Sequence, residues 1–161
     1  MSDESKYRKY AEKVKIFHGL SPEEVEFILH CGNVLHFHEN QTIFHEGMLG
    51  TNVFIVLSGE VGIYNKSELI AKCEVGDAFG EMAVLNRRPR IASATAITPA
   101  KVFTLDERSI NNILEKHVAV RLLLNVIHIL SERLEKANAE NVELRKALRR
   151  TGGAPARQQT H

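Results

Sequence analysis

The sequence predicts an α+β fold that is mainly β: an antiparallel β-roll or jelly roll, with short helices before it and one long C-terminal dimerisation helix after it. Three observations lead to this fold class. Apolar residues recur at intervals of three and four near the start of the chain. Short apolar runs separated by turn residues fill the middle of the chain, and a heptad pattern follows them. We therefore divide the chain into a β-roll with flanking helices (1–117), a long helix or coiled coil (118–150) and a tail (151–161).

The N-terminal residues are expected to form two helices. The apolar stripe of the first helix consists of Tyr7, Tyr10, Val14 and Phe17. Ser21 can cap the second helix, Pro22 suits its first position, and Glu24 completes a capping box. This second helix should end at Gly32.

The middle of the chain is expected to be a series of short strands. The candidate strands cover residues 34–38, 42–44, 53–57, 61–64, 69–75, 92–97 and 102–105. Turn residues such as Ser58-Gly59 separate them. Short strands with such turns between them are typical of an antiparallel roll or sandwich.

The C-terminal part is expected to be helical up to a polar tail. Asp106 can cap a short helix, and a longer helix should run from about Val118 to about Arg150. Residues 151–161 contain two glycines, one proline and few apolar side chains, so we expect them to be disordered.

Composition and charge exclude several kinds of protein. The chain has 161 residues and a formal net charge of +1, so no overall field would attract nucleic acid or a membrane. No apolar run reaches the roughly 20 residues of a membrane span, and the N-terminus has no secretory apolar region. We expect a cytoplasmic protein with free thiols at Cys31 and Cys73. His36, His38 and His45 lack the further ligands of a metal site, so no metal is expected.

Residues 76–96, GDAFGEMAVLNRRPRIASATA, contain the candidate ligand site. A turn at Gly80 opens one helical turn whose N–H groups can face an anion. Glu81 can accept a hydrogen bond from a sugar hydroxyl. Arg90, nine residues later, offers a planar and permanently charged fork suited to phosphate. Together these residues could hold a phosphorylated sugar.

The order and spacing of this segment resemble the phosphate-binding cassette of the cyclic nucleotide-binding domain family. That cassette reads F-G-E-x-A-x-L and, after a short spacer, P-R-x-A-[ST]. The resemblance extends over about residues 20–135, and Gly47, Phe54 and the turn at 58–61 also match it. It implies a cyclic-nucleotide sensor. Since no G-x-S-x-G, H-E-x-x-H or Walker sequence occurs, we do not expect an enzyme.

The resemblance also implies particular ligand contacts. Glu81 should accept from the ribose 2′-hydroxyl, and Arg90 should pair with the cyclic phosphate. Backbone N–H groups should complete the cradle, together with the Ser93 hydroxyl or N–H. The ligand-binding residues expected in the cassette are Phe79, Gly80, Glu81, Met82, Ala83, Arg90, Ile91, Ala92 and Ser93.

The base is expected to be adenine. Family members that select cGMP often have a threonine just after the cassette arginine, where it bonds guanine. Here that position is Ile91, whose side chain cannot form hydrogen bonds. We therefore expect cAMP as the ligand in preference to cGMP.

The long helix carries two apolar stripes, which favours contact with both the roll and a partner helix. The heptad seam consists of Val120, Leu123, Ile127, Leu130, Leu134, Ala137, Asn141, Leu144 and Leu148. The second stripe consists of Leu122, Val126, Ile129 and Arg133. Asn141 at an a position favours a parallel two-stranded register, so we expect a parallel homodimer through residues 120–148. The alternative is one wide stripe buried within a monomer.

Members of the catabolite activator branch also use their long helix to cover the adenine. Matching their Arg-Leu pair to Arg133-Leu134 places the adenine contacts at Ala137 and Asn138. Ala137 departs from the hydroxyl residue of that branch, whereas Asn138 could reach the ligand of the neighbouring subunit. The resemblance thus adds Arg133 and Asn138 to the expected ligand-binding residues.

The sequence predicts a cAMP sensor that transmits ligand occupancy through its C-terminal helix to a protein partner or an output domain. One alternative is a vestigial β-roll that acts only as a dimerisation module. Another is a fragment of a DNA-binding transcriptional regulator. The near-neutral charge and the short polar stretch after Arg150 disfavour the last of these, so nucleic acid is not an expected partner.

Overall fold

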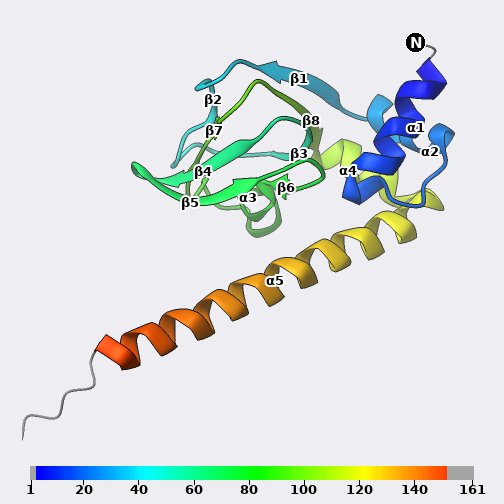
Figure 1. Ribbon diagram of the computed structural model, residues 1–161. Coiled ribbons are helices and arrows are strands. Elements are labelled where there is room, and N and C mark those ends of the chain that lie inside the picture. Colours follow the sequence, from blue (N-terminus) through cyan, green and yellow to red (C-terminus); the bar gives the residue numbers. More distant parts are fainter. Residues whose placement is uncertain (1–2, 152–161) are drawn as a thin grey trace, which may run out of the picture. The chain divides into compact units, whose positions relative to one another are not determined.

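The computed structural model describes the backbone of residues 3–151 and the side chains of residues 5–149 (Figure 1). The chain divides into two compact units, Met1–Val126 and Ile127–His161. Of the described residues, the first unit contains every strand, and those of the second unit form the later part of one helix. The tail predicted to be disordered lies outside the described residues, except for Thr151, which ends that helix.

From residue 3, where the description of the backbone begins, three short helical segments precede the strands: α1 (Asp3–Lys13), η1 (Lys15–Phe17) and α2 (Pro22–His30). The predicted capping box is present, because Ser21 Oγ accepts from the Glu24 N–H and the Glu24 carboxylate accepts from the Ser21 N–H. Helix α2 ends at His30, before the predicted Gly32, and its last turn is closed by the Cys31 N–H.

The prediction that one helix carries the whole first stripe is wrong. Helix α1 ends at Lys13, and Val14 is extended, with φ −97° and ψ 106°. Val14 and Phe17 are nevertheless fully buried. The extended residue turns the chain so that both side chains enter the core, and this burial outweighs the local tendency to continue the helix.

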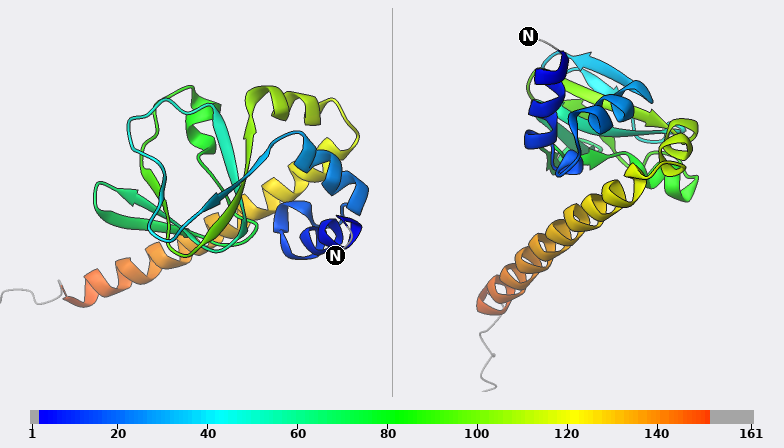
Figure 2. Two further views of the ribbon diagram at one scale, coloured as in Figure 1. Left: turned by 90° about the horizontal axis from the view of Figure 1, so that it is seen from above. Right: turned by 90° about the vertical axis from the view of Figure 1, so that its right-hand side faces the viewer.

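Among the residues that the structure describes, eight antiparallel strands form two four-stranded sheets, as predicted for a β-roll, and Figure 2 shows this strand region from two further sides. One sheet has the order β1-β8-β3-β6, and the other has the order β2-β7-β4-β5. The strands are β1 (Asn33–Phe37), β2 (Thr42–Phe44), β3 (Asn52–Ser58), β4 (Val61–Asn65), β5 (Glu68–Cys73), β6 (Ala78–Phe79), β7 (Ser93–Ala96) and β8 (Ala100–Asp106). The two-residue strand β6 was not predicted, because it is too short to show an alternating pattern.

The main core lies between the two sheets. Phe54 and Val56 of β3 face this core, together with the alternate residues Ala94 and Ala96 of β7. Ile55, between them on β3, faces the helical side, where it lines an apolar cavity together with residues of η1, α2 and α5. Strand β3 is buried from Phe54 to Leu57 because both of its faces are covered.

Helix α4 (Glu107–Leu114) follows β8, and α5 (Val118–Thr151) follows α4. Asp106 caps α4 as predicted, since its carboxylate accepts from the Ser109 N–H at 2.8 Å. Helices α1, α2 and α4 gather at the same end of the strands in Figure 1 and in the left view of Figure 2. Leu122 and Val126, from the second predicted stripe of α5, line the apolar cavity at this end.

The described residues of the second unit form the part of helix α5 from Ile127 to Thr151. Its seam leucines are exposed in the chain: Leu134 by 62%, Leu144 by 62% and Leu148 by 69%. An exposed apolar seam at heptad spacing is typical of a helix that pairs with another helix. None of the helices that the structure describes is apolar over a stretch long enough to cross a membrane.

Candidate functional site

The cassette begins where β6 changes abruptly into a helix. Gly80 lies in the left-handed region, with φ +77°, and is the N-cap of α3 (Glu81–Asn86). Because glycine has no side chain, no side chain caps the first N–H groups of α3. The predicted helical turn after Gly80 is therefore confirmed, and its first turn can offer N–H donors to a ligand.

Arg90 is the buried cation of this site. Its side chain is only 6% exposed. Nη2 donates to the carbonyl oxygen of Asn52 at 2.8 Å, and Nη1 donates to the carbonyl oxygen of Gly80. Burial lowers the pKa of the Arg90 guanidinium, and the charge of Glu81 acts in the opposite direction. Arginine stays protonated in proteins, so the site contains a desolvated positive charge.

Two aromatic rings lie against the same guanidinium. The Cζ atom of Arg90 is 4.3 Å from the ring centroid of Phe44 and 5.4 Å from that of Phe54. Phe79 completes the aromatic group, with its ring centroid 5.3 Å from that of Phe54. The predicted ligand contact Phe79 is itself only 3% exposed, so it belongs to the core beneath the site.

The backbone of Arg90 is fixed by a neighbouring loop. The Arg90 N–H donates to the carbonyl oxygen of Met48 at 2.8 Å, and the Gly47 N–H donates to the carbonyl oxygen of Arg90 at the same distance. Ser93 Oγ accepts from the N–H of Glu46 in this loop at 2.9 Å. The Ser93 hydroxyl hydrogen is not used in that bond, so it is available to a ligand.

Glu81 is the first residue of α3 and is partly buried. Its carboxylate forms no hydrogen bond or ion pair with the described side chains, although its charge acts on Arg90. Such a carboxylate can accept hydrogen bonds from sugar hydroxyls. Glu81 and Arg90 thus provide an acceptor and a cation in one region of the roll.

The remaining cassette positions are of two kinds. Ala83 and Ala92 are each 5% exposed, and their methyl side chains occupy little space beside their backbone N–H groups. Met82 and Ile91 are exposed by 50% and 58%. Ile91 therefore presents an apolar side chain beside Arg90.

The two ligand-binding residues predicted on the long helix belong to the second unit. Arg133 and Asn138 both lie on α5 after Ile127, and Asn138 is exposed. Their contact with the ligand stays a prediction.

Sequence reasoning missed Gly50, Asn52 and the ring of Phe44 as parts of the site. Asn52 supplies a carbonyl oxygen to Arg90, and its side chain donates to Thr104 Oγ1 at 3.1 Å. These residues precede Arg90 by about 40 positions, so no local pattern connects them to it. A second glycine three residues after Gly47 was the one available sign of a close backbone approach.

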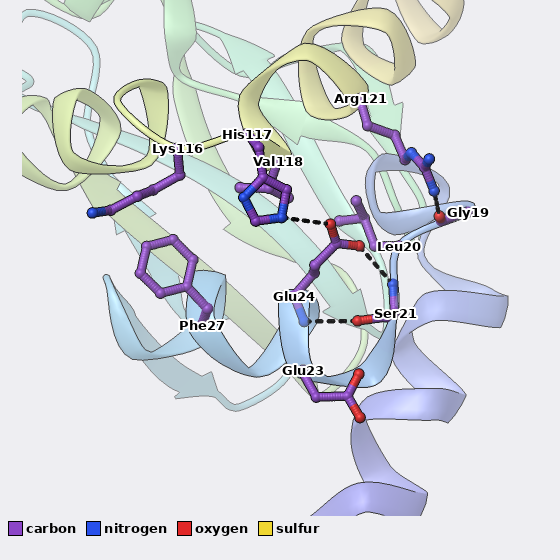
Figure 3. A pocket seen from close by; sticks show the side chains of 10 residues that line it. All are labelled: Gly19, Leu20, Ser21, Glu23, Glu24, Phe27, Lys116, His117, Val118 and Arg121. Carbon is purple, nitrogen blue, oxygen red and sulfur yellow. Dashed lines mark hydrogen bonds and ion pairs between the residues drawn. The ribbon is translucent and has the colours of Figure 1, made fainter.

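A second cavity, of about 970 Å³, lies at the helical end of the first unit (Figure 3). It is larger than the apolar cavity beside Ile55. Its lining residues are Gly19, Leu20, Ser21, Glu23, Glu24, Phe27, Lys116, His117, Val118 and Arg121. Glu24 lies between Ser21 and His117, and its carboxylate is 3.4 Å from His117 Nε2. None of these residues belongs to the cassette, and both signs of charge are present. The cavity therefore lies where α2 meets the start of α5, and it is separate from the cassette.

No group of three or more His, Cys, Asp or Glu side chains within the described part of the chain is arranged to hold a metal ion.

Comparison with known proteins identifies a family whose match includes the cassette residues. The family model described as "Cyclic nucleotide-binding domain" matches residues 34–117. The chain is 33% identical over 108 residues to the cAMP-dependent protein kinase regulatory subunit of Hypocrea atroviridis, covering 67% of this chain and 23% of that protein. It is 29% identical over 130 residues to the cyclic AMP receptor protein of Thermus thermophilus. This match covers 78% of this chain and 59% of that protein. The chain thus spans less than two thirds of the length of these curated relatives.

A solved structure shows the same similarity in three dimensions. The catabolite activator protein of Thermus thermophilus superposes with a TM-score of 0.67 at 28% sequence identity. The match covers 81% of this chain and 62% of that one.

Proposed function

This chain belongs to the cyclic nucleotide-binding domain family, and from that premise we propose that it is a regulatory sensor that binds cAMP at the Arg90 cradle. The observation that carries the proposal is that Arg90 is buried without a counterion in the described part of the chain. This guanidinium is 6% exposed and forms no ion pair with any described carboxylate. A buried charge without a counterion is costly, so folds retain one where an anion completes the site.

Phosphate is the anion that suits this site best. The guanidinium has five N–H donors, and two of them are engaged by the carbonyl oxygens of Gly80 and Asn52. The other donors can take a phosphate with the geometry that arginine favours. The uncapped N–H groups at the start of α3 would add to the positive environment around Gly80.

The sugar and the base would be held by neighbouring residues. Glu81 has a carboxylate without a hydrogen-bond partner in the described chain, which would accept from the ribose 2′-hydroxyl. Ile91 is 58% exposed beside Arg90 and cannot bond guanine through its side chain. These two features support a ribonucleotide ligand and, of the two common cyclic nucleotides, cAMP.

Ligand occupancy would be transmitted through α5. The leucines of its seam are exposed in the chain, and Asn141 stands at an a position of the same seam. We propose that two chains pair in parallel through residues 120–148 and that a protein partner or output domain responds to a shift in this helix. In this proposal the chain is a cytoplasmic regulator without catalytic activity of its own.

The test is a thermal unfolding experiment with cAMP, cGMP and 5′-AMP. At a ligand concentration about 100-fold above Kd, binding should add roughly 2.7 kcal/mol and raise the melting temperature by about 5–10 °C. We expect the rise with cAMP and a smaller one with cGMP. The absence of any rise in a folded protein would overturn the sensor and favour the alternative supported by the exposed seam, a dimerisation module that binds no nucleotide.

A further inference from the structure

The guanidinium of Arg90 is held on several sides by groups other than a ligand. Phe44 lies beneath it, with a distance of 4.3 Å between the Cζ atom of Arg90 and the ring centroid. This distance is well within the range of a cation–π contact, which becomes stronger when the pair is desolvated. Phe44 is only 9% exposed, and Arg90 is 6% exposed. The contact is therefore shielded from water.

The loop before β3 approaches the same guanidinium from another side. A Cβ atom added to Gly50 would lie 2.2 Å from Arg90 Nε and 2.3 Å from Arg90 Cζ. The backbone of Gly50 does not lie in the left-handed region, unlike that of Gly80, so its conformation is open to other residues. Glycine is thus required at position 50 because any side chain there would occupy the space of the Arg90 guanidinium.

We propose that Phe44 and Gly50 are positioning residues that hold the Arg90 guanidinium ready for phosphate. The ring of Phe44 supports one face of the planar group, and Gly50 leaves the room in which Nε and Cζ lie. Arginine has a flexible side chain, and a ligand that must first order it binds more weakly. This inference rests on the proposed function, because it assigns these residues to the binding of a cyclic phosphate.

The first test substitutes Phe44 and a matched phenylalanine. Phe44→Leu removes the ring beneath Arg90, whereas Phe37→Leu makes the same change at a residue that packs against the same core and has no ring contact with Arg90. We expect Phe44→Leu to weaken cAMP binding by about tenfold or more in calorimetric titration. Phe37→Leu should keep the wild-type Kd, and Phe44→Tyr, which retains an aromatic face, should restore most of the affinity.

A second readout needs no ligand. The Arg90 Nε–H signal in a proton–nitrogen NMR spectrum can be identified by its loss in Arg90→Lys. An aromatic ring at 4.3 Å should displace this signal from the usual arginine position. The displacement should shrink in Phe44→Leu, where only the more distant ring of Phe54 remains, and should keep its wild-type size in Phe37→Leu. Gly50→Ala should shift the signal again and should also weaken cAMP binding by at least about tenfold, because its methyl group takes the space of the guanidinium.

These results separate the two proposals. Absence of cAMP binding in the wild-type protein would overturn the proposed function, and the NMR signal would still report whether Phe44 orders Arg90. Wild-type binding with equal Kd values for Phe44→Leu and Phe37→Leu would overturn the positioning role of Phe44. If Phe44→Leu does not fold, Gly50→Ala decides: wild-type affinity and an unshifted Nε–H signal in that variant would contradict the inference.

Discussion

Asn125 Nδ2 donates a hydrogen bond to the carbonyl oxygen of Ile16 across 2.9 Å, joining α5 to a segment 109 residues earlier in the chain. The same amide group also donates to the carbonyl oxygen of His18 at 3.0 Å. One turn earlier on α5, Arg121 Nη1 donates to the carbonyl oxygen of Gly19. The start of α5 is therefore fastened to η1 and to the loop between η1 and α2 by side chains that donate to backbone carbonyl groups.

Substitution of Asn125 should destabilise the first unit. Asn125→Ala leaves the carbonyl oxygens of Ile16 and His18 without this donor, at a cost of about 1–2 kcal/mol in the free energy of unfolding. Chemical denaturation measures this change. Asn138→Ala, at an exposed position of the same helix, should have almost no effect on unfolding, and equal effects of the two variants would contradict the fastening role of Asn125.

Substitution of Arg90 should remove nucleotide binding without unfolding the protein. In Arg90→Ala the cyclic phosphate loses its cation, so we expect at least a 100-fold rise in the Kd for cAMP, which corresponds to about 3 kcal/mol. Isothermal titration measures the Kd, and circular dichroism checks the fold. A variant with wild-type affinity would show that the phosphate binds elsewhere.

Glu81 should determine the preference for a ribose hydroxyl. We expect the wild-type protein to bind cAMP about tenfold more tightly than 2′-deoxy-cAMP, because the deoxy compound has no hydroxyl to donate to the carboxylate. Glu81→Gln should bind cAMP more weakly and should largely lose this discrimination. Competition titrations with both nucleotides measure it, and unchanged discrimination in the variant would assign the sugar contact to another residue.

The exposed seam of α5 should pair two chains. Leu130→Glu together with Leu134→Glu introduces charge at positions that are 49% and 62% exposed in the chain. Burial of each leucine in a dimer would contribute roughly 1.5–3 kcal/mol, so dimerisation should weaken by more than about 100-fold. Analytical ultracentrifugation measures the dissociation constant. Glu135→Gln is the control outside the seam, and a wild-type protein that stays monomeric at high concentration would refute the pairing.

Because of the cap of α4, the free energy of unfolding should depend on pH in the acidic range. Hydrogen bonds from Ser109 lower the pKa of Asp106, so the folded state favours the ionised carboxylate. A group whose pKa is lowered on folding stabilises the protein above its unfolded pKa, near 4, and this contribution is lost as pH falls through the folded value. The difference in unfolding free energy between the wild type and Asp106→Ala should therefore shrink below about pH 4. Denaturation at pH 6 and at pH 3 tests this, and a constant difference would show that charge has no part in the cap.

The features that could be predicted from the sequence are those that depend on nearby residues. The capping box at Ser21 and Glu24, the cap at Asp106 and the long helix from Val118 each follow from local side-chain chemistry. The helical turn after Gly80 was found in the same way. These elements form as expected because tertiary packing agrees with their local preference.

The features that were missed depend on contacts between distant segments. Val14 is extended because the core receives both its side chain and that of Phe17, and no local pattern predicts that turn. Gly50 and Phe44 become parts of the site only when β2 and the loop before β3 meet Arg90. The cassette could thus be recognised from the sequence, whereas the surroundings that hold its arginine could not.

The pairing of β1 with β8 has a consequence for the order of folding. Strand β1 lies at the edge of its sheet, and its neighbour there is β8, with Asn33 opposite Thr104. On a ribosome, β1 must therefore wait for about 70 further residues before its hydrogen-bonding partner is synthesised. Strand β8 lies between β1 and β3 in the sheet. Its synthesis therefore allows the β1–β8 and β3–β8 pairs to form together. Closure of the roll should be a late and cooperative event, slower than in a helical protein of this size.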